Sequence, residues 1–267
     1  MPRGRTKRVL VRRREAGEVH RLPDELIVEE PLEIRLDGHR VATTMRTPGA
    51  DFELAVGFCF ADGLLAGAPV QQVRYCATGS AVDTEFNVVT VETGGVAPIP
   101  EARLGTTTSS CGLCGSTTLF ELESRLTPLV DPLRFSAEVI ESVPEAVLGG
   151  QKLFGVTGGV HAAAVFDSAG EISTVREDIG RHNAVDKVVG TMVLEGRLPA
   201  RDLGLFVSGR ASFELVQKAW AAGFSALVAV SAPSSLAVEA AERAGLLLVG
   251  FARPGRINIY TGALLPN

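Results

Sequence analysis

Apolar and polar residues alternate in the first third of the chain, which is the pattern of exposed β-strands. Positions 32–36 alternate strictly, and Asp37-Gly38 then signals a tight hairpin turn into a second strand over 39–45. Residues 51–61 have the spacing of a short helix. A second hairpin is expected to join the segment around 73–75 to 85–91. The N-terminal part is therefore predicted to be β-rich.

From residue 160 onward the pattern changes to strands that alternate with helices. A hairpin is expected over 160–166 and 171–176, followed by a helix from about 182 to 195. The apolar residues of that helix share one face: Val185, Val188, Val189, Met192 and Val193. Three further short strands are expected at 203–207, 226–230 and 246–249. Helices follow the first two, and this order predicts a partly parallel sheet with helices on its faces.

Polar segments follow these three strands, at the edge where parallel α/β sheets bind ligands. They are Ser208-Gly209-Arg210, Ser231-Ala232-Pro233-Ser234-Ser235 and Phe251-Ala252-Arg253-Pro254-Gly255-Arg256. Small residues allow a ligand to approach the backbone, and guanidinium groups suit phosphate. Taken singly, each segment is better explained by structure: Ser234 or Ser235 caps a helix, and the arginines are solvated. Three such segments on one edge favour a phosphate-bearing, nucleotide-like ligand.

Two of the four cysteines, Cys111 and Cys114, lie two residues apart in a glycine-rich stretch that precedes a helical pattern. Backbone N–H groups at a helix start stabilise a thiolate, the nucleophilic form of cysteine. Cys59 and Cys76 are interpreted as structural, so neither a disulfide framework nor a second metal-ligand pair is expected. Cys111 and Cys114 are then free thiols, metal ligands or transient redox partners.

Charge is distributed unevenly along the 267 residues, whose net charge is −5. Seven basic residues precede the first acid, Glu15, and without them the chain would carry −12. Residues 1–20 are predicted to be a disordered basic arm, and the acidic remainder argues against a nucleic-acid partner. No apolar stretch reaches the length of a membrane span, and no apolar segment completes an export signal. A cytoplasmic protein without a membrane partner is therefore expected.

Five separated motifs, in order, resemble the FdhD family of formate dehydrogenase accessory sulfurtransferases. They are 47–58 (TPGADFELAVGF), 110–115 (SCGLCG), 177–187 (EDIGRHNAVDK), 208–214 (SGRASFE) and 251–260. The resemblance runs from about residue 31 to 262. It implies an α/β (α+β overall) fold with a cytidine-deaminase-like, three-layer domain over 101–267. A smaller β-rich domain over 21–100 and a homodimer are also implied.

The resemblance implies that sulfur moves from a cysteine desulfurase, through a persulfide on Cys111, to the bis-molybdopterin guanine dinucleotide cofactor. That cofactor is then delivered to formate dehydrogenase. Cys114 either relays the sulfur or releases it by forming a disulfide. The family's cofactor-binding stretch matches Phe251, Ala252, Arg253, Pro254, Gly255 and Arg256, and GDP-like nucleotides are expected to mimic the cofactor. The residues themselves add Ser208, Gly209, Arg210 and Ser231 to this site.

Other readings of the same residues remain open to different degrees. A zinc deaminase needs H-x-E and P-C-x-x-C, but Ala162-Ala163 follows His161 and Ser110 precedes Cys111. A structural zinc site lacks a second ligand pair, and a dithiol oxidoreductase lacks a thioredoxin-like context, so no metal site is predicted. The serious alternative is a cofactor chaperone that catalyses no sulfur transfer.

The motif 177–187 also carries charged residues whose roles the sequence leaves open. Arg181 and His182 are candidates for lining the site, and a purely structural His182 is an equal alternative. Asp178 is interpreted as a helix cap and Asp186 as a surface charge, with functional roles as alternatives.

Overall fold

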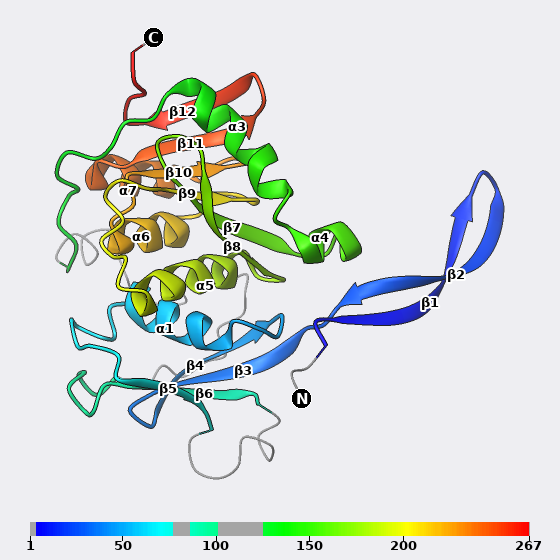
Figure 1. Cartoon of the computed structure of the whole chain (residues 1–267), viewed down its shortest axis with the longest axis horizontal. Helices are drawn as coiled ribbons and strands as arrows, with labels where there is room; N and C mark the ends of the chain where they lie inside the picture. Colours follow the sequence, from blue (N-terminus) through cyan, green and yellow to red (C-terminus); the bar gives the residue numbers. More distant parts are fainter. Residues whose placement is uncertain (1–3, 77–85, 101–124, 267) are drawn as a thin grey trace.

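The computed structural model describes residues 4–76, 86–100 and 125–266. The elements stack in layers, with a six-stranded sheet toward one end of the molecule and a four-stranded sheet toward the other (Figure 1). Helices lie between the two sheets, and a long two-stranded hairpin projects from the side. This arrangement confirms the expected α/β class with a smaller β-rich N-terminal part.

The six-stranded sheet has the order β12-β11-β10-β9-β7-β8. Its strands are β7 (His161–Phe166), β8 (Ile172–Asp178), β9 (Gly204–Val207), β10 (Ala226–Ala229), β11 (Leu247–Arg253) and β12 (Arg256–Thr261). Strands β9, β10 and β11 are parallel to one another, whereas β7, β8 and β12 pair antiparallel. The predicted partly parallel sheet is therefore confirmed.

Helices cover both faces of this sheet, because its strands are apolar on both sides. Leu205 and Val207 pack toward α5 (Arg181–Leu194), α6 (Phe213–Ala222) and α7 (Ser235–Ala244). Phe206, between them, faces the opposite side and packs with α3 (Ala137–Leu148). The short α4 (Lys152–Thr157) follows α3. Neither α3 nor α4 was predicted from the sequence, although Ser136 caps α3 by accepting a hydrogen bond from Val139 N.

The four-stranded sheet has the order β4-β3-β6-β5. Its strands are β3 (Glu30–Leu36), β4 (His39–Arg46), β5 (Gln72–Tyr75) and β6 (Val88–Glu92), and α1 (Asp51–Ala61) packs on one face. The two predicted hairpin pairings and the helix over 51–61 are confirmed. Asp37 and Gly38 both have positive φ, as the tight turn requires.

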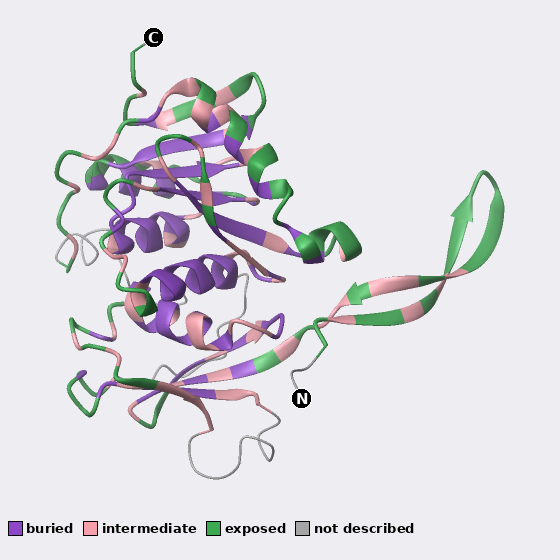
Figure 2. Cartoon of the chain, viewed as in Figure 1, coloured by how far each residue is buried: buried purple, intermediate pink, exposed green. Residues whose placement is uncertain are grey.

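Helices α1 and α5 join the two halves of the molecule at a close crossing. Gly57 of α1 lies against the backbone of Asp186, and Gly190 of α5 lies against the backbone of Glu53, with no room for a Cβ at either glycine. Helix α5 is consequently buried on almost every side (Figure 2). The sequence predicted only one apolar face for this helix, because its second buried face carries polar side chains.

The basic N-terminal segment is a β-hairpin and not the disordered arm that the sequence predicted for residues 1–20. Strands β1 (Thr6–Glu15) and β2 (Glu18–Ile27) pair along their whole length around an Ala16-Gly17 turn. The hairpin is mostly exposed and leaves the body near α4 (Figures 1 and 2). The sequence did not indicate these strands because their apolar residues do not alternate strictly with polar ones.

No helix within the described ranges is long and apolar enough to cross a bilayer.

Candidate functional site

The three polar segments predicted to meet at one edge of the sheet lie side by side in the structure. Ser231 N donates a hydrogen bond to Gly209 O at 3.3 Å, and Phe251 N donates one to Ser231 O at 3.3 Å. A short parallel bridge between Ala211 and Pro233 continues the pairing beyond the strands. The backbones that follow β9, β10 and the middle of β11 therefore form one continuous rim.

The segment 251–256 differs from its predicted form. Phe251, Ala252 and Arg253 belong to β11, which the sequence predicted to end at residue 249, and Arg256 begins β12. The strand continues because β12 pairs with it antiparallel, with a register shift between Gly250 and Arg253 and a positive φ at Phe251. Ala252 is buried, whereas Arg253, Pro254, Gly255 and Arg256 are exposed at the tip of the β11–β12 hairpin.

A cavity of about 570 Å³ opens beside this rim, between the sheet and helices α3 and α4. Phe206, Val230 and Phe154 give it apolar walls, and His161 and Ser208 add polar groups. Ser208 Oγ accepts a hydrogen bond from Ala162 N at 2.9 Å and lies 3.4 Å from His161 Nδ1. The sequence weighed His161 only as a zinc ligand and missed it as a wall of this cavity.

His161 lies in a positively charged environment. Burial lowers its pKa from the ordinary value, and the nearby charges of Arg181 and His182 lower it further. The imidazole is therefore neutral near neutral pH and serves as a hydrogen-bonding wall rather than as a charge.

Arg181 lies in the first turn of α5 and brings its guanidinium group, with an unpaired hydrogen-bond donor, to the same edge. Its Nε is buried and has no hydrogen-bond partner. Burial and the neighbouring charge of Arg210 lower the pKa of Arg181. A ligand with negative charge fits this surplus of donors and positive charge.

His182 and Glu214 lie close together beside Arg181. His182 Nε2 lies 3.5 Å from Glu214 Oε2 and 3.1 Å from Ser212 Oγ. The hydrogen bond from His182 is the main cause that lowers the pKa of Glu214 to about 2. The Glu214 carboxylate is thus engaged with His182.

Much of the motif 177–187 builds the scaffold around the site. Asp178 is fully buried and accepts hydrogen bonds from Thr47 N, Gly180 N and Asn183 Nδ2, while Lys187 Nζ lies 2.7 Å from its Oδ2. It therefore joins the α5 start to the segment before α1, which is a wider role than the predicted helix cap. Glu177 accepts hydrogen bonds from the first backbone N–H groups of α4, at Leu153 and Phe154, and so positions one wall of the cavity.

Asp186 is not the surface charge that the sequence predicted. It is buried, and its Oδ1 lies 2.6 Å from Lys218 Nζ. Burial raises the pKa of Asp186 to about 6. The positive charge of Lys218 is the main compensation for this buried carboxylate. The sequence could not reveal this pairing because Lys218 belongs to α6.

The predicted sulfur-carrying residues Cys111 and Cys114 lie outside the described residues. Cys59 is fully buried in the core of the small sheet, as predicted, and burial raises the pKa of its thiol. Cys76 is half-buried at the end of β5. Within the described ranges, no three His, Cys, Asp or Glu side chains gather as a metal-binding group.

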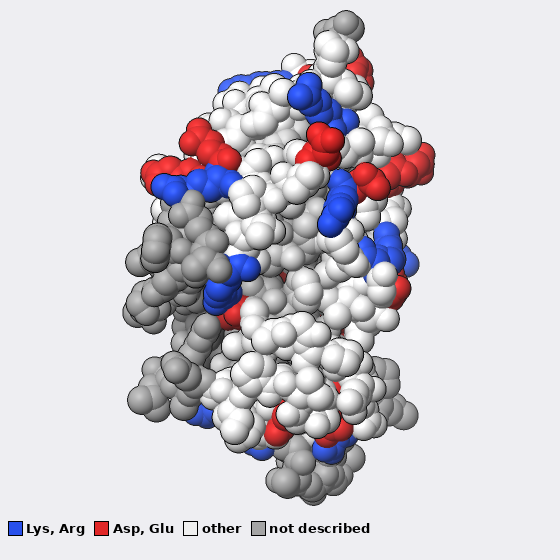
Figure 3. Space-filling view, turned by 90° about the vertical axis from the view of Figure 1, so that its left-hand side faces the viewer, with Lys and Arg blue, Asp and Glu red and all other residues white. Residues whose placement is uncertain are grey.

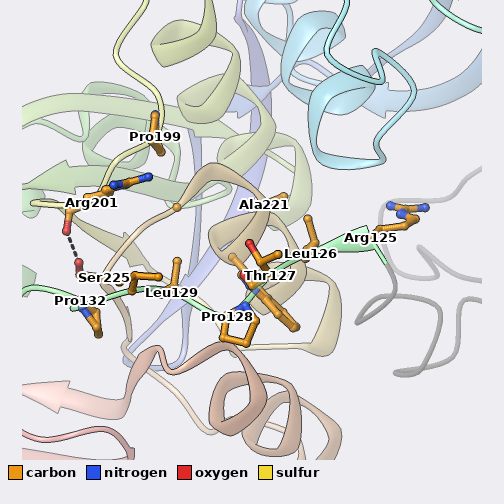
Figure 4. A pocket seen from close by; sticks show the side chains of 13 residues that line it. Arg125, Leu126, Thr127, Pro128, Leu129, Pro132, Pro199, Arg201, Ala221 and Ser225 are labelled. Atoms are coloured by element: carbon orange, nitrogen blue, oxygen red, sulfur yellow. Dashed lines mark hydrogen bonds between the residues drawn. The ribbon is translucent and has the colours of Figure 1, made fainter.

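A second, smaller pocket of about 250 Å³ lies at the opposite edge of the sheet. In Figure 4, Arg201 and Arg125 lie at its two ends, with Thr127 and Pro128 between them. Trp220 Nε1 closes part of it by donating to Thr127 O at 2.8 Å. The face of the molecule drawn in Figure 3 carries scattered charges among uncharged residues. None of the predicted site residues lines this pocket.

The fold and the rim define an α/β protein whose larger sheet carries a polar, arginine-bearing rim at one edge. Comparison with known proteins then identifies its family: residues 27–264 match the FdhD/NarQ family, and the chain belongs to it. It is 48% identical to the sulfur carrier protein FdhD of Streptomyces avermitilis, over 98% of this chain and 95% of that protein. It is 49% identical to the protein of the same name from Mycolicibacterium paratuberculosis, over 93% of this chain and 94% of that protein.

A solved structure shares the fold. It is a crystal structure from Desulfotalea psychrophila, described as a formate dehydrogenase accessory protein. The TM-score is 0.77 with 24% sequence identity, and the match covers 98% of this chain and 100% of that one. At this identity, the likeness carries the fold alone.

Proposed function

We propose that this chain is a sulfur carrier in the maturation of formate dehydrogenase. It would receive sulfur from a cysteine desulfurase and pass it to the bis-molybdopterin guanine dinucleotide cofactor of that enzyme. Family membership supports the sulfur-carrying role. The observation that carries the cofactor role is the continuous rim in which Gly209, Ser231 and Phe251 are hydrogen-bonded in series.

The proposed chemistry begins at Cys111. Its thiolate attacks the outer sulfur of the donor's persulfide, the sulfur–sulfur bond of the donor breaks, and the donor leaves as a thiolate. Cys111 thereby becomes a persulfide, and no external oxidant or reductant is consumed. In the relay route, the outer sulfur passes on as sulfane sulfur, directly or through Cys114, and Cys111 leaves as a thiolate; the accepting molybdenum cofactor supplies the two electrons that reduce this sulfur to sulfide. In the release route, the Cys114 thiolate attacks the inner sulfur on Cys111, sulfide leaves toward the cofactor, and a cellular dithiol reduces the resulting Cys111–Cys114 disulfide.

The cofactor is the substrate in this scheme, and its phosphates suit the basic rim. Guanidinium groups bind phosphate through paired charge-assisted hydrogen bonds. Backbone at small residues lets the ligand come close, and the neighbouring cavity accepts an apolar or aromatic portion. The residues proposed to hold the cofactor are Ser208, Gly209, Arg210, Ser231, Phe251, Ala252, Arg253, Pro254, Gly255 and Arg256.

Cysteine desulfurase and formate dehydrogenase are the partners in this proposal, and the chain is proposed to act as a homodimer. A second candidate function is a chaperone that binds and delivers the cofactor without carrying sulfur. The rim alone supports the chaperone and the sulfur carrier equally, because both functions require cofactor binding and the rim contains none of the cysteines.

Intact-protein mass spectrometry separates the two functions. The wild type and the variants Cys111→Ala, Cys114→Ala and Cys59→Ala are incubated with a cysteine desulfurase and cysteine. A reducible gain of one sulfur atom that disappears in Cys111→Ala and persists in the buried-thiol control Cys59→Ala is expected. No gain in the wild type, together with restoration of formate dehydrogenase activity by Cys111→Ala, would leave the chaperone.

A further inference from the structure

Arg181, a candidate for lining the site but without an assigned role in cofactor binding, lies against the Ser208-Gly209-Arg210 segment. Its Cδ lies 3.6 Å from the position that a Cβ on Gly209 would occupy, and His161 Nδ1 lies 3.4 Å from the same position. Gly209 is therefore the narrow floor between an arginine side chain and an imidazole ring.

We infer that Arg181 and Arg210 together form the phosphoryl-binding subsite of this edge, with Gly209 as its floor and His161 as its wall. This inference rests on the proposed function, because it assigns the charged part of the proposed ligand to particular residues. It places the phosphates on the rim itself and not on the exposed arginines at the β11–β12 tip.

Arg210 directly follows Gly209, and Arg181 Cδ lies 3.6 Å from the Cβ position of that glycine, so both arginines flank the same residue. Burial lowers the pKa of Arg181, and the charge of Arg210 lowers it further. The carboxylate that offsets this repulsion is Glu214, which already pairs with His182 at 3.5 Å. A phosphoryl group carries more than one negative charge and several acceptor oxygens, so it can compensate both arginines at once.

The hydrogen-bonding state of Arg181 points the same way. An arginine has five donors, and the buried Nε of Arg181 has no acceptor. A buried donor without a partner is costly, and an oxygen-rich ligand removes this cost when it binds.

The arginines at the tip differ from Arg181 in their surroundings. Arg253 and Arg256 are both exposed and face each other across the β11–β12 turn, and Arg210 is exposed as well. Interactions of exposed charges are weakened by water and salt, whereas Arg181 is half-buried. A phosphate should therefore gain more from the site that contains Arg181 than from the tip.

Isothermal titration calorimetry with GDP and with guanosine tests the inference on the full-length protein. Arg181→Met and Arg210→Met are each expected to weaken GDP binding roughly tenfold or more, since each removes charge-assisted hydrogen bonds. Guanosine binding should stay unchanged, and inorganic pyrophosphate should compete with GDP in the wild type. Arg40→Met, at an exposed arginine on the four-stranded sheet, is the matched control and should bind GDP like the wild type.

Arg181→Lys keeps the charge but loses the planar fork, so an intermediate loss of GDP affinity is expected and guards against misfolding as the explanation. GDP affinity equal to the wild type in both Met variants would overturn the inference. So would an absence of GDP binding by the wild type, or a larger loss in Arg253→Met and Arg256→Met. Persulfide formation on Cys111, measured in the same proteins, reports separately on the proposed sulfur transfer.

Discussion

Two glycines determine how closely the halves of the molecule approach. Gly57 and Gly190 stand at the crossing of α1 and α5, where a Cβ would overlap the backbone of the facing helix. Alanine at either position must push the helices apart, and overpacking of this kind costs about 1–3 kcal/mol or more. We expect Gly57→Ala to lower the free energy of unfolding by at least that amount in urea denaturation.

Gly155 supplies the control for this substitution. It lies in α4, and nothing lies within 4 Å of the position that its Cβ would take. Gly155→Ala should therefore leave stability unchanged or raise it by up to about 1 kcal/mol. Equal effects of the two substitutions would refute the close crossing.

The buried ion pair of Asp178 and Lys187 leads to a second prediction. Lys187→Met leaves the Asp178 carboxylate buried without its cation, and such losses cost about 3–5 kcal/mol. Lys152→Met, at an exposed lysine of α4, should change the free energy of unfolding by less than about 0.5 kcal/mol. Urea denaturation measures the free energy of unfolding of both variants. A decrease of less than about 1 kcal/mol for Lys187→Met would contradict the pairing.

Glu214 makes stability depend on pH in a defined direction. Its pKa falls from the ordinary 4.5 to about 2 in the folded protein, chiefly through the hydrogen bond with His182. The folded state therefore binds this proton less tightly than the unfolded state does. The stabilisation is fully present above pH 4.5 and is lost as the pH falls toward 2.

Denaturation of the wild type and Glu214→Gln across this pH range checks the assignment. The difference in unfolding free energy should be largest above pH 4.5 and should shrink on acidification. Glu239→Gln, at an exposed glutamate of α7, should show a smaller difference throughout. If the difference in unfolding free energy between the wild type and Glu214→Gln does not change with pH, the contact with His182 does not set the pKa of Glu214.

At the level of elements, the hairpin β1–β2 is nearly independent of the body. Among the described residues, it meets the body at its root, where Ile27 lies beside Gly159 and Arg5 lies beside Gly49. Removing residues 12–15 and 18–21 keeps the Ala16-Gly17 turn and, because four residues leave each strand, preserves which side chains face each way.

The protein with this shortened hairpin should have a free energy of unfolding within about 1 kcal/mol of that of the wild type, because the removed residues are exposed and bury little apolar area. Urea denaturation followed by circular dichroism measures it. A loss of several kcal/mol would mean that the distal part of the hairpin packs on the body.

Elements with a strong local signal were predictable, and those with a weak one were not. The Asp37-Gly38 turn followed from its turn residues, and the helix over 51–61 followed from its helical spacing. The strands before Ser208 and Ser231 followed from short apolar runs that end at polar segments. Helix α3 contains Pro144, a residue that usually interrupts helices, and was missed. Ser234 has the ordinary capping role that was weighed for it, accepting from Ala237 N.

At the level of the whole molecule, the two sheets should unfold together. Helix α1 packs on the four-stranded sheet and crosses α5, which packs on the six-stranded sheet, so losing either half exposes the core of the other. Fluorescence of the single tryptophan, Trp220 in α6, reports on the large sheet, and far-UV circular dichroism reports on both.

The two signals should give coincident urea transitions with one midpoint. A circular dichroism transition in two steps, only one of which coincides with the fluorescence change, would show that the four-stranded sheet is a separate folding unit.

The sequence by itself determined the features that depend on neighbouring residues. Strand alternation, turn residues and the order of strands and helices placed three polar segments on one edge, because local backbone preferences and the handedness of parallel connections act over short distances. The cysteine pair and the family motifs are equally readable without a fold.

Only the tertiary structure decided which charges are buried and which arginines meet. Asp186 finds Lys218 on another helix, and Arg181 finds Arg210 across Gly209. The free energy of a charged side chain depends on its burial and on partners that are distant along the chain. The local sequence pattern gives neither the burial of a charged side chain nor its distant partners. The electrostatics of the site therefore depend on how the layers pack together.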